Sequence, residues 1–513
     1  MVVNKLLLWL TPSPFTRPTA QEPAASSNKI AILDGLRGIA CLIVLHEHWT
    51  CAIDDPWRTY ALKDLATGFM WKPFVVLSWG GEAMVNLFFV ISGYVLLYKP
   101  LSLLYSSEHQ RMYESIASSV FRRAFRLWLP TMASILLIAV LTRMQVFEPA
   151  RHIYRSLNKA QLRSFEATAN VTRILEQGLV SERPKPRLVR EIPPPMANST
   201  IEQGLDVIME CFLLIKTSAV GEVGKHDVWT YDAHVWTIPV EFKSSITIFI
   251  LAIGTSMFTS GWRHLLHGTV LLYCSLQGYR TALFVAGMIV AELDIMRKRS
   301  ERMANRRHQV ALLGEKSLST DTSTLSEQLN GTSAAWGFCF VVGLYLLSIP
   351  YVEPVTVVPY VYLARLLPTF VLDKNKLIRS VGAVLTTWSC LNFSMVAPIF
   401  ESSIAQYLGR ISFALYLTHG LVIRSLGYVL IWNLRSWCGA YVREETSLGQ
   451  FVLIWLGGYI VLLPSCLWTA DIFWRTVDVP SVQLARWLEQ RLRRPQEDKP
   501  SNLSTDPIRV CSE

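Results

Sequence analysis

Ionisable side chains interrupt the first long apolar stretch of the chain, residues 32–52. The stretch contains five of them: Asp34, Arg37, His46, Glu47 and His48. A charged group at the centre of a membrane-spanning helix costs about 2.5 to 3.5 kcal/mol, so each of them needs a reason. On a helix that advances about 100° per residue, Arg37 and His48 lie on one face, separated by roughly 16 Å along the axis. The spacing predicts an arginine near one membrane surface and a histidine toward the other.

His48 is the candidate catalytic base of this stretch. Asp34 lies within about 40° of His48 around the helix and is assigned a supporting role, whereas His46 points about 160° away. The alternative is that His48 lies at the membrane interface and only meets lipid headgroups. His46, Glu47 and His48 point in different directions and cannot together hold a metal ion. Because the cysteines also lack paired spacing, we expect no metal site.

A second candidate group, Glu241, lies in the apolar stretch 234–258. It shares a helix face with His234 and lies about 10 Å inside the outer end of that stretch. A histidine and a carboxylate at one depth suit general-base catalysis, in which the carboxylate orients the imidazole. We therefore predict that Glu241 orients His48. The alternative is that Glu241 pairs with Lys243 or with an arginine elsewhere.

Two further polar positions are assigned to the support of the site. Ser92, beside Gly93, is typical of a small-residue contact between helices. His419 shares a helix face with Ser412 and Tyr416, and could equally be an interior histidine with satisfied hydrogen bonds. Neither Ser92 nor His419 is expected to carry out chemistry itself.

The elements that must position these residues are membrane-spanning helices. Of the 513 residues, 51% are hydrophobic and 17% are charged, against about 25% charged in an average soluble protein. Stretches of about 20 mainly apolar residues predict an all-α, polytopic bundle of about ten transmembrane helices. They lie near residues 32–52, 75–98, 127–147, 234–258, 264–279, 281–297, 334–352, 381–400, 411–433 and 450–474. The stretch 205–220 contains three charged residues and is better interpreted as amphipathic or re-entrant.

Basic residues flank these stretches on one side of the expected bundle. Lysines and arginines follow the second and the sixth stretch, within 99–126 and 297–307, and arginines recur in the tail at 475–494. Since cytoplasmic loops carry an excess of positive charge, these regions and both chain termini are expected in the cytoplasm. Orientation in a membrane thus explains the net charge of +10, and no nucleic-acid partner is expected.

The same topology divides the chain into three regions. They are a cytoplasmic N-terminal segment at 1–29, a membrane domain at 30–475 and a cytoplasmic tail at 476–513. The loop 148–204 should face the lumen or exterior, and it carries glycosylation sequons at Asn170 and Asn198. The polar loop 298–333 is expected to be cytoplasmic and disordered. The sequons favour a multi-pass protein of a eukaryotic endomembrane or plasma membrane.

Five segments, in this order, resemble the acyltransferase 3 family of multi-span membrane enzymes. They are residues 33–40 (LDGLRGIA), 88–94 (FFVISGY), 122–130 (RRAFRLWLP), 236–242 (WTIPVEF) and 408–419 (LGRISFALYLTH). The arginine, ten residues, histidine spacing of Arg37 and His48 is the most specific match. The resemblance runs from about Ile32 to Trp474. It implies transfer of an acyl group, often acetyl, onto a hydroxyl-bearing small molecule such as a secondary metabolite, a lipid or a glycan.

The resemblance also implies acyl-CoA, for example acetyl-CoA, as a co-substrate, with no tightly bound cofactor. Guanidinium groups bind phosphates in a forked geometry, so the arginines of the cytoplasmic face are assigned to CoA: Arg37, Arg122, Arg123 and Arg126. Orientation in the membrane alone would also explain the last three. Glu241, predicted above to orient His48, is assigned as catalytic, and Trp236, in the matching segment 236–242, as supporting. His48 would either deprotonate the acceptor hydroxyl or carry the acyl group itself.

Two other functions are compatible with the sequence. Buried arginine, histidine and glutamate in ten spans would also suit a proton-coupled transporter, although no internal inverted repeat is visible. A non-catalytic membrane scaffold is disfavoured because it gives no reason to bury Arg37 and Glu241. Consumption of acyl-CoA by the purified protein separates an enzyme from a transporter.

Overall fold

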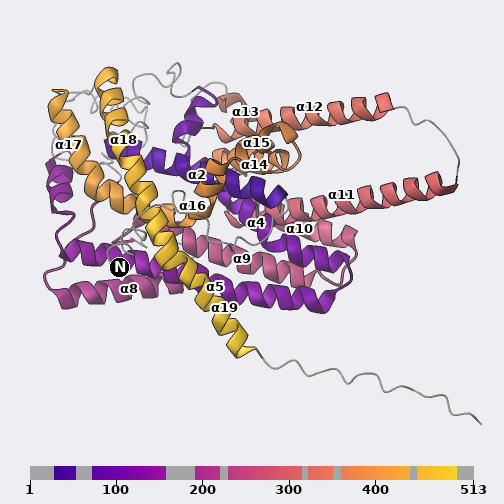
Figure 1. The fold of residues 1–513 in the computed structure, drawn as a ribbon, viewed down its shortest axis with the longest axis horizontal. Coiled ribbons are helices and arrows are strands. Elements are labelled where there is room, and N and C mark those ends of the chain that lie inside the picture. The colour runs from indigo at the N-terminus through magenta and orange to yellow at the C-terminus, as the bar shows by residue number, and fades with distance from the viewer. Residues whose placement is uncertain are drawn as a thin grey trace, which may run out of the picture.

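Helices make up the regular structure of the described part of the chain. The computed structural model describes residues 28–53, 72–156, 191–219, 229–314, 322–349, 360–439 and 447–493, and no strand occurs among them. The predicted all-α class is therefore confirmed. In chain order (Figure 1) the helices are α2 (Asn28–Ile53), η3 (Val75–Trp79), α4 (Gly81–Tyr105), α5 (His109–Arg143), α8 (Thr200–Ala219), η4 (Ala233–Trp236), α9 (Thr237–Gly254), α10 (Ser260–Leu276), α11 (Thr281–Gly314), α12 (Thr322–Leu347), α13 (Tyr360–Leu366), α14 (Lys374–Cys390), η5 (Ser394–Val396), α15 (Ala397–Phe400), α16 (Ser403–Val422), η6 (Ile423–Gly427), α17 (Tyr428–Trp437), α18 (Leu448–Phe473), η7 (Trp474–Asp478) and α19 (Val479–Leu492).

Several of these helices are long and apolar enough to cross a membrane. Within the described residues there are five: Gly81–Tyr105, His109–Arg143, Ala233–Gly254, Ser403–Trp437 and Gly449–Leu492. A sixth results if Lys374–Cys390 and Ser394–Phe400, which are bent by 84° relative to each other, form one broken span. The expected ten spans are not confirmed. The other four expected stretches overlap α2, α10, α11 and α12, which are helical but more polar or shorter.

Two close helix crossings form the centre of the molecule. Gly38 of α2 packs against α16, where a Cβ atom would lie 2.5 Å from the backbone nitrogen of Gly409. Gly93 of α4 packs against α11, where a Cβ atom would lie 2.2 Å from the carbonyl oxygen of Phe284. Only glycine permits such approaches, so Gly93 takes the packing role that the sequence predicts. Helix α2 also packs against α4, so the α2–α16 crossing and the α4–α11 crossing are joined by direct contact.

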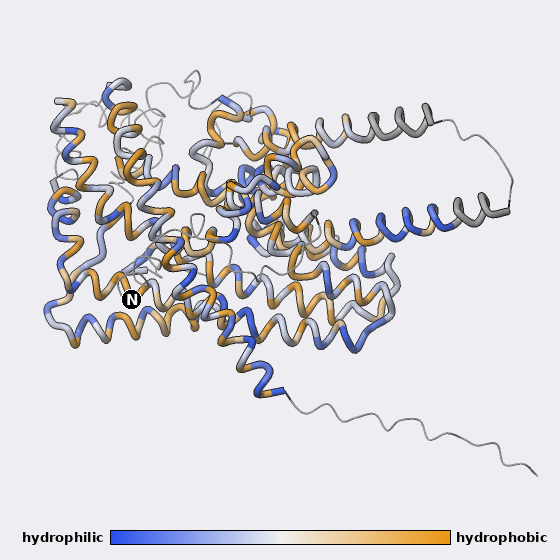
Figure 2. The backbone as a smooth tube through the Cα atoms, in the orientation of Figure 1, coloured by the Kyte–Doolittle hydropathy of each residue, from blue (hydrophilic) through white to orange (hydrophobic). Residues whose placement is uncertain are grey.

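The basic helix ends lie together in space. Arg299 of α11 donates a hydrogen bond to the carbonyl oxygen of Tyr105, at the end of α4. Arg122 of α5 lies 3.4 Å from the carboxylate of Glu489 on α19. Figure 2 shows α19 and the projecting part of α11 as hydrophilic, in contrast to the mixed and largely apolar body. The three basic regions expected on one side of the membrane are therefore linked by direct contacts.

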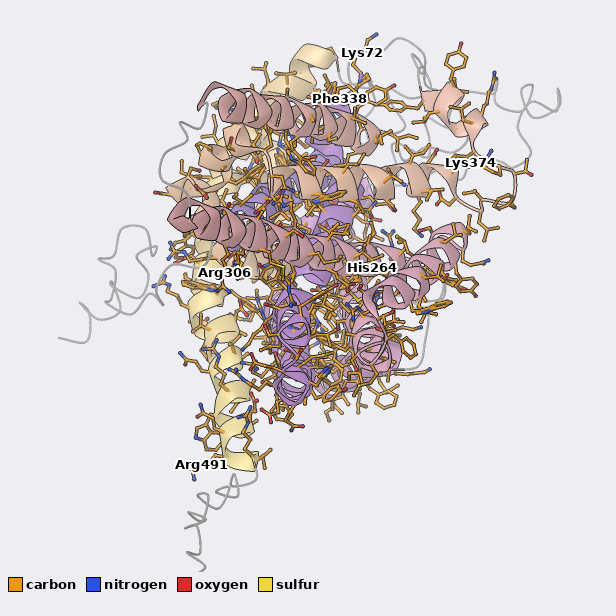
Figure 3. The ribbon with its side chains drawn as sticks, turned by 90° about the vertical axis from the view of Figure 1, so that its right-hand side faces the viewer. Lys72, His264, Arg306, Phe338, Lys374 and Arg491 are labelled. Carbon is orange, nitrogen blue, oxygen red and sulfur yellow. The ribbon has the colours of Figure 1, made fainter. Side chains whose placement is uncertain are left out.

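The structure departs from the expected disordered loop at 298–333. Helix α11 continues to Gly314 and α12 begins at Thr322, and both project from the body of the molecule (Figure 1). Residues 297–306 contain four arginines and one residue each of lysine, glutamate, methionine and alanine, all of high helix propensity, and this favours continuation of α11. In Figure 3, Arg306 on this extension and Arg491 on α19 lie on the same left-hand side of the view.

Residues 205–219 of the stretch expected to be amphipathic lie in helix α8, which packs against α5 and α9. Ile208 and Phe212 on this helix are exposed, whereas Glu210 is buried. Burial raises the pKa of Glu210 to about 7, and its carboxylate accepts a hydrogen bond from the backbone of Tyr231. The sequon residue Asn198 is exposed just before α8. The other sequon, the chain start at 1–27 and the tail beyond residue 493 lie outside the described residues.

Candidate active site

Three histidines from distant parts of the chain meet at the centre of the structure. His48 belongs to α2, His234 to η4 and His419 to α16. The ring centroids lie 4.2 Å apart for His48 and His234, 4.4 Å for His234 and His419, and 5.1 Å for His48 and His419. His419 thus lies in the site that the sequence assigned it to support. His234, which carried no assignment of its own, is the third member of this histidine cluster.

Glu191 is the carboxylate that contacts His48. Its Oε1 atom lies 2.8 Å from Nδ1 of His48 and 3.2 Å from Nε2 of His234. Glu191 is only 3% exposed, and its carbonyl oxygen accepts a hydrogen bond of 2.6 Å from the hydroxyl of Tyr428. Burial opposes ionisation of Glu191, but His234 and His48 outweigh it and hold its pKa well below the usual value. Glu191 is therefore an anion that faces two imidazoles.

The sequence prediction missed Glu191 because it lies in the long outer loop, away from every apolar stretch. A local signal was present: three consecutive prolines, at 193–195, follow it before α8 begins. Such a run favours an extended, semi-rigid polyproline II backbone. The prolines separate the buried Glu191 from the exposed Asn198.

Asp232 holds His234 from the other side. Its Oδ1 atom lies 2.6 Å from Nδ1 of His234 and also accepts a hydrogen bond from the backbone nitrogen of that residue, which caps η4. Arg424 of η6 donates to the same oxygen at 3.1 Å. Burial opposes ionisation of Asp232, but His234 and Arg424 lower its pKa to about 2. The ring of His234 is thus fixed between two carboxylates.

Helix α16 makes room for that ring with a glycine. A Cβ atom on Gly420 would lie 2.6 Å from Cε1 of His234 and 2.9 Å from Nη2 of Arg424. The sequence prediction also missed Arg424, although an arginine five residues after His419 in an apolar stretch meets the criterion that singled out Arg37.

Glu241 does not take the position that the sequence predicted. Its Oε1 atom lies 2.7 Å from Nη2 of Arg123 and accepts a hydrogen bond from the hydroxyl of Ser92 at 3.3 Å. Seven residues separate Glu241 from His234, so it lies about 10 Å further along the span, while His234 itself reaches the depth of His48. Pairing with an arginine elsewhere, the alternative left open above, is the arrangement found.

The arginines assigned to acyl-CoA fall into two groups. Arg37, Arg123 and Arg126 line a cavity of about 160 Å³, which we call the arginine cavity and which Ser92 and Glu241 also line. Nη1 of Arg37 also lies 3.6 Å from Oδ1 of Asp34, which precedes it by three residues on α2. Arg122 is not among the residues that line this cavity, and it pairs with α19 instead.

A larger cavity of about 450 Å³ lies on the other side of the site, and we call it the histidine cavity. His48, His234 and Trp236 form part of its lining. The guanidinium group of Arg280 lies over the ring of Trp236, 4.7 Å from its centroid, and also lines the cavity. The histidine cavity thus offers imidazoles, a cation and an aromatic face to a bound molecule.

A thin partition separates the two cavities. Val85, Thr237 and Tyr416 line both of them. The hydroxyls of Thr237 and Tyr416 lie 2.7 Å apart, and the Tyr416 hydroxyl also donates to the carbonyl oxygen of His234. A molecule in one cavity would therefore lie a single layer of side chains away from a molecule in the other.

Comparison with protein families identifies the family of the chain. A family model of acyltransferase 3, described as an acyltransferase domain, matches residues 30–474. The chain belongs to the acyltransferase 3 family. The matched range agrees with the resemblance from Ile32 to Trp474, and it contains every residue of the histidine cluster and of the arginine cavity except Asp478.

The acyltransferase has curated relatives of nearly the same length. It is 29% identical to the O-acetyltransferase PaAT-1 of Phomopsis amygdali, over 91% of this chain and 85% of that protein. It is 26% identical to acyltransferase R4 of Phoma sp. and 24% identical to acyltransferase clz18 of Cochliobolus lunatus, each over 96% of the relative. No solved structure matches the chain. These relatives support the assignment of the protein as an acyltransferase.

Proposed function

We propose that this acyltransferase moves an acyl group, in the first instance acetyl, from acyl-CoA to a hydroxyl group of a small-molecule acceptor. The observation that carries the proposal is the contact of His48 with the buried carboxylate of Glu191 at the wall of the histidine cavity. An imidazole held on one nitrogen by a carboxylate is the arrangement that general-base catalysis requires.

In the proposed reaction the donor occupies the arginine cavity. Arg37, Arg123 and Arg126 supply guanidinium groups for the phosphates of CoA, and the size of the cavity, about 160 Å³, suits only part of that molecule. The remainder of CoA extends toward the basic helix ends. The thioester lies at the partition of Thr237 and Tyr416. No resident cofactor is required, since acyl-CoA is consumed as a substrate.

The acceptor occupies the histidine cavity. Nδ1–H of His48 donates to Glu191, and in this tautomer Nε2 carries the lone pair that accepts the proton of the acceptor hydroxyl. The hydroxyl oxygen attacks the thioester carbon, the new ester C–O bond forms and the C–S bond breaks. The CoA thiolate leaves and takes the proton from Nε2 of His48. The charges of reactants and products balance, and His48 returns to its starting state.

Two further groups have positioning roles in this proposal. His234, fixed by Asp232, lies against both His48 and Glu191 and keeps the carboxylate in place. Glu241 holds Arg123 at the wall of the arginine cavity, so it acts on the donor rather than on His48.

The acceptor class follows from the histidine cavity and from the relatives. A cavity of about 450 Å³ with Trp236 and Arg280 in its wall has the size that suits a drug-sized molecule. The name of the relative from Phomopsis amygdali states O-acetylation. A secondary metabolite therefore fits better than a long glycan.

The membrane arrangement is part of the proposal. About ten helices cross a eukaryotic endomembrane or the plasma membrane, and the basic helix ends and both termini face the cytosol, where acyl-CoA is made. Loop 148–204, with its sequons, faces the other side. Modification of Asn198 by glycans in a cell, read as a mobility shift that a glycosidase removes, tests this orientation.

Replacement of His48 tests the function itself. His48→Ala, assayed with radiolabelled acetyl-CoA and extracts of the host organism as acceptor, should lose acetyl transfer. His46→Ala is the matched control, because His46 lies on the same helix but packs against Trp455 and Trp79, with ring centroids 4.5 and 5.2 Å away. Full activity in His48→Ala, with both variants folded, would overturn the proposal.

A further inference from the structure

The histidine cluster has the donor atoms of a four-coordinate metal site. His48, His234 and His419 each offer one ring nitrogen within 4.8 Å of the other two. Oε1 of Glu191 lies 2.8 Å from the donor atom of His48 and 3.2 Å from that of His234. Three imidazoles and a carboxylate are a ligand set that suits Zn²⁺ and related divalent ions. We propose that these four residues bind a zinc-class divalent cation.

The distances between donor atoms fit such an ion. In a tetrahedral zinc site with bonds of about 2.0 to 2.1 Å, neighbouring donor atoms lie roughly 3.3 Å apart. Nδ1 of His48 and Nε2 of His234 are 3.2 Å apart, and both face Oε1 of Glu191 at similar distances. Small rotations of His419 and Glu191 would complete a tetrahedron around one centre.

The outer nitrogens of two histidines are already held in the manner of metal ligands. Nδ1 of His234 faces the carboxylate of Asp232 at 2.6 Å, and Nδ1 of His419 lies 3.1 Å from the carbonyl oxygen of Leu415. A hydrogen bond at one ring nitrogen fixes the tautomer and presents the lone pair of the other nitrogen to a metal. Both rings therefore turn Nε2 toward the centre of the cluster.

One of those nitrogens lacks a hydrogen-bond partner within the described residues. Nε2 of His419 is buried and has none there, and the residue as a whole is 1% exposed. A buried polar atom without a partner is costly and calls for an explanation. A metal ion at the centre of the cluster would supply the missing partner. His48 and His234 line the histidine cavity, which gives an ion access to the cluster.

Metal binding has a consequence for catalysis that rests on the proposed function. An imidazole that coordinates a metal through Nδ1 carries its proton on Nε2 and can no longer accept one there. His48 cannot be a zinc ligand and the catalytic base at the same time. The metal-bound form of the enzyme is therefore the inactive form, and a chelator restores the active form.

The experiment measures the ion directly on the full chain in detergent micelles. After treatment with a chelator and equilibrium dialysis against micromolar Zn²⁺, elemental analysis should find one zinc per chain, and Co²⁺ in its place should give the visible absorption of a four-coordinate site. His419→Ala should lose both, and Asp232→Asn should weaken the affinity about 10- to 100-fold. His46→Ala, the matched control, should retain both.

Two outcomes decide whether the metal site exists without any measurement of activity. Failure of the wild-type chain to retain zinc, or equal retention by His419→Ala, overturns the proposal. If His419→Ala does not fold, Glu191→Gln, which preserves the shape of the side chain, takes its place with the same expected loss. Zinc retention without inhibition of acetyl transfer would leave the metal site in place and contradict His48 as the base. Loss of activity in metal-free His48→Ala, together with failure of the wild-type chain to bind zinc, would leave His48 as the base and contradict the metal site.

Discussion

Nδ1 of His48 and Oε1 of Glu191 lie 2.8 Å apart, although 143 residues separate the two in the chain. His48 belongs to the first helix described and Glu191 to the end of the long outer loop. The contact therefore holds this loop against the helix bundle while it orients the imidazole. The loop, which contains none of the five segments that resemble the family, supplies the carboxylate on which the proposed chemistry depends.

Glu191→Gln should test whether the charge of Glu191, rather than the space that its side chain fills, orients His48. The amide keeps the volume of the carboxylate but loses its charge and one acceptor atom, so the tautomer of His48 is no longer fixed. We expect kcat to fall about 100- to 10,000-fold, the range of general-base catalysis, with little change in the KM for acyl-CoA. Glu202→Gln, at an exposed carboxylate of α8, is the control. Equal rates in the two variants would exclude a role of Glu191.

Arg37→Gln and Arg122→Gln form a second pair. Arg37 lines the arginine cavity, whereas Arg122 pairs with Glu489. Since a hydrogen bond to a charged group contributes about 1.5 to 3 kcal/mol, loss of Arg37 should raise the KM for acyl-CoA about 10- to 100-fold. Arg122→Gln should change it by much less. Steady-state kinetics with varied acyl-CoA measures both, and a larger effect of Arg122→Gln would place the donor elsewhere.

Gly420→Ala tests the close approach of α16 to His234. The new methyl group would meet the ring at 2.6 Å and push it away from Asp232. Because misplacement of a catalytic group by about 1 Å can cost about 100-fold in rate, we expect a loss of that order in kcat. Gly268→Ala on α10, where a Cβ atom meets nothing within 4 Å, is the matched control. Wild-type activity of Gly420→Ala would show that the position of His234 is unimportant.

The stability of the site should depend on pH through Asp232. Its pKa is lowered from 3.8 to about 2 in the folded chain. A group with a depressed pKa contributes stability above its unfolded value and loses it as the pH falls through the folded value. The contribution, on the order of 2 kcal/mol, should therefore be present at pH 7 and decline between about pH 4 and pH 2. Thermal unfolding of Asp232→Asn and the wild type should differ at pH 7 and converge at low pH.

The exposed Asp206 provides the control for that measurement. Asp206→Asn should unfold at nearly the wild-type temperature at every pH. A difference between Asp232→Asn and the wild type that stays constant down to pH 2 would mean that packing, rather than charge, accounts for the effect of Asp232.

Helix periodicity was sufficient to identify the residues that one helix brings together. It selected His48, which lines the histidine cavity, over His46, which packs among aromatic rings. It also selected Arg37 for the arginine cavity. These predictions needed only the rotation and rise of a helix, which are the same in every protein.

Contacts between helices and loops could not be predicted in the same way. The sequence predicts Glu241 at the depth of His48, but the residue of this span that lies beside His48 is His234, two turns earlier. Glu191 lies on a loop, where no periodicity relates a position in the sequence to a position in space. The meeting of three histidines depends on how α2, η4 and α16 pack, and a single helix does not determine that packing.

The partition formed by the hydrogen-bonded Thr237 and Tyr416 also limits which chemical groups must cross from one cavity to the other. In the proposed reaction, nucleotide and acceptor approach from opposite ends of the bundle and never share a compartment. Only the acyl group, a few uncharged atoms in the case of acetyl, passes the two hydroxyls. The enzyme could then modify a molecule beyond the cytosol without carrying CoA out or the acceptor in, and the membrane would stay closed to both.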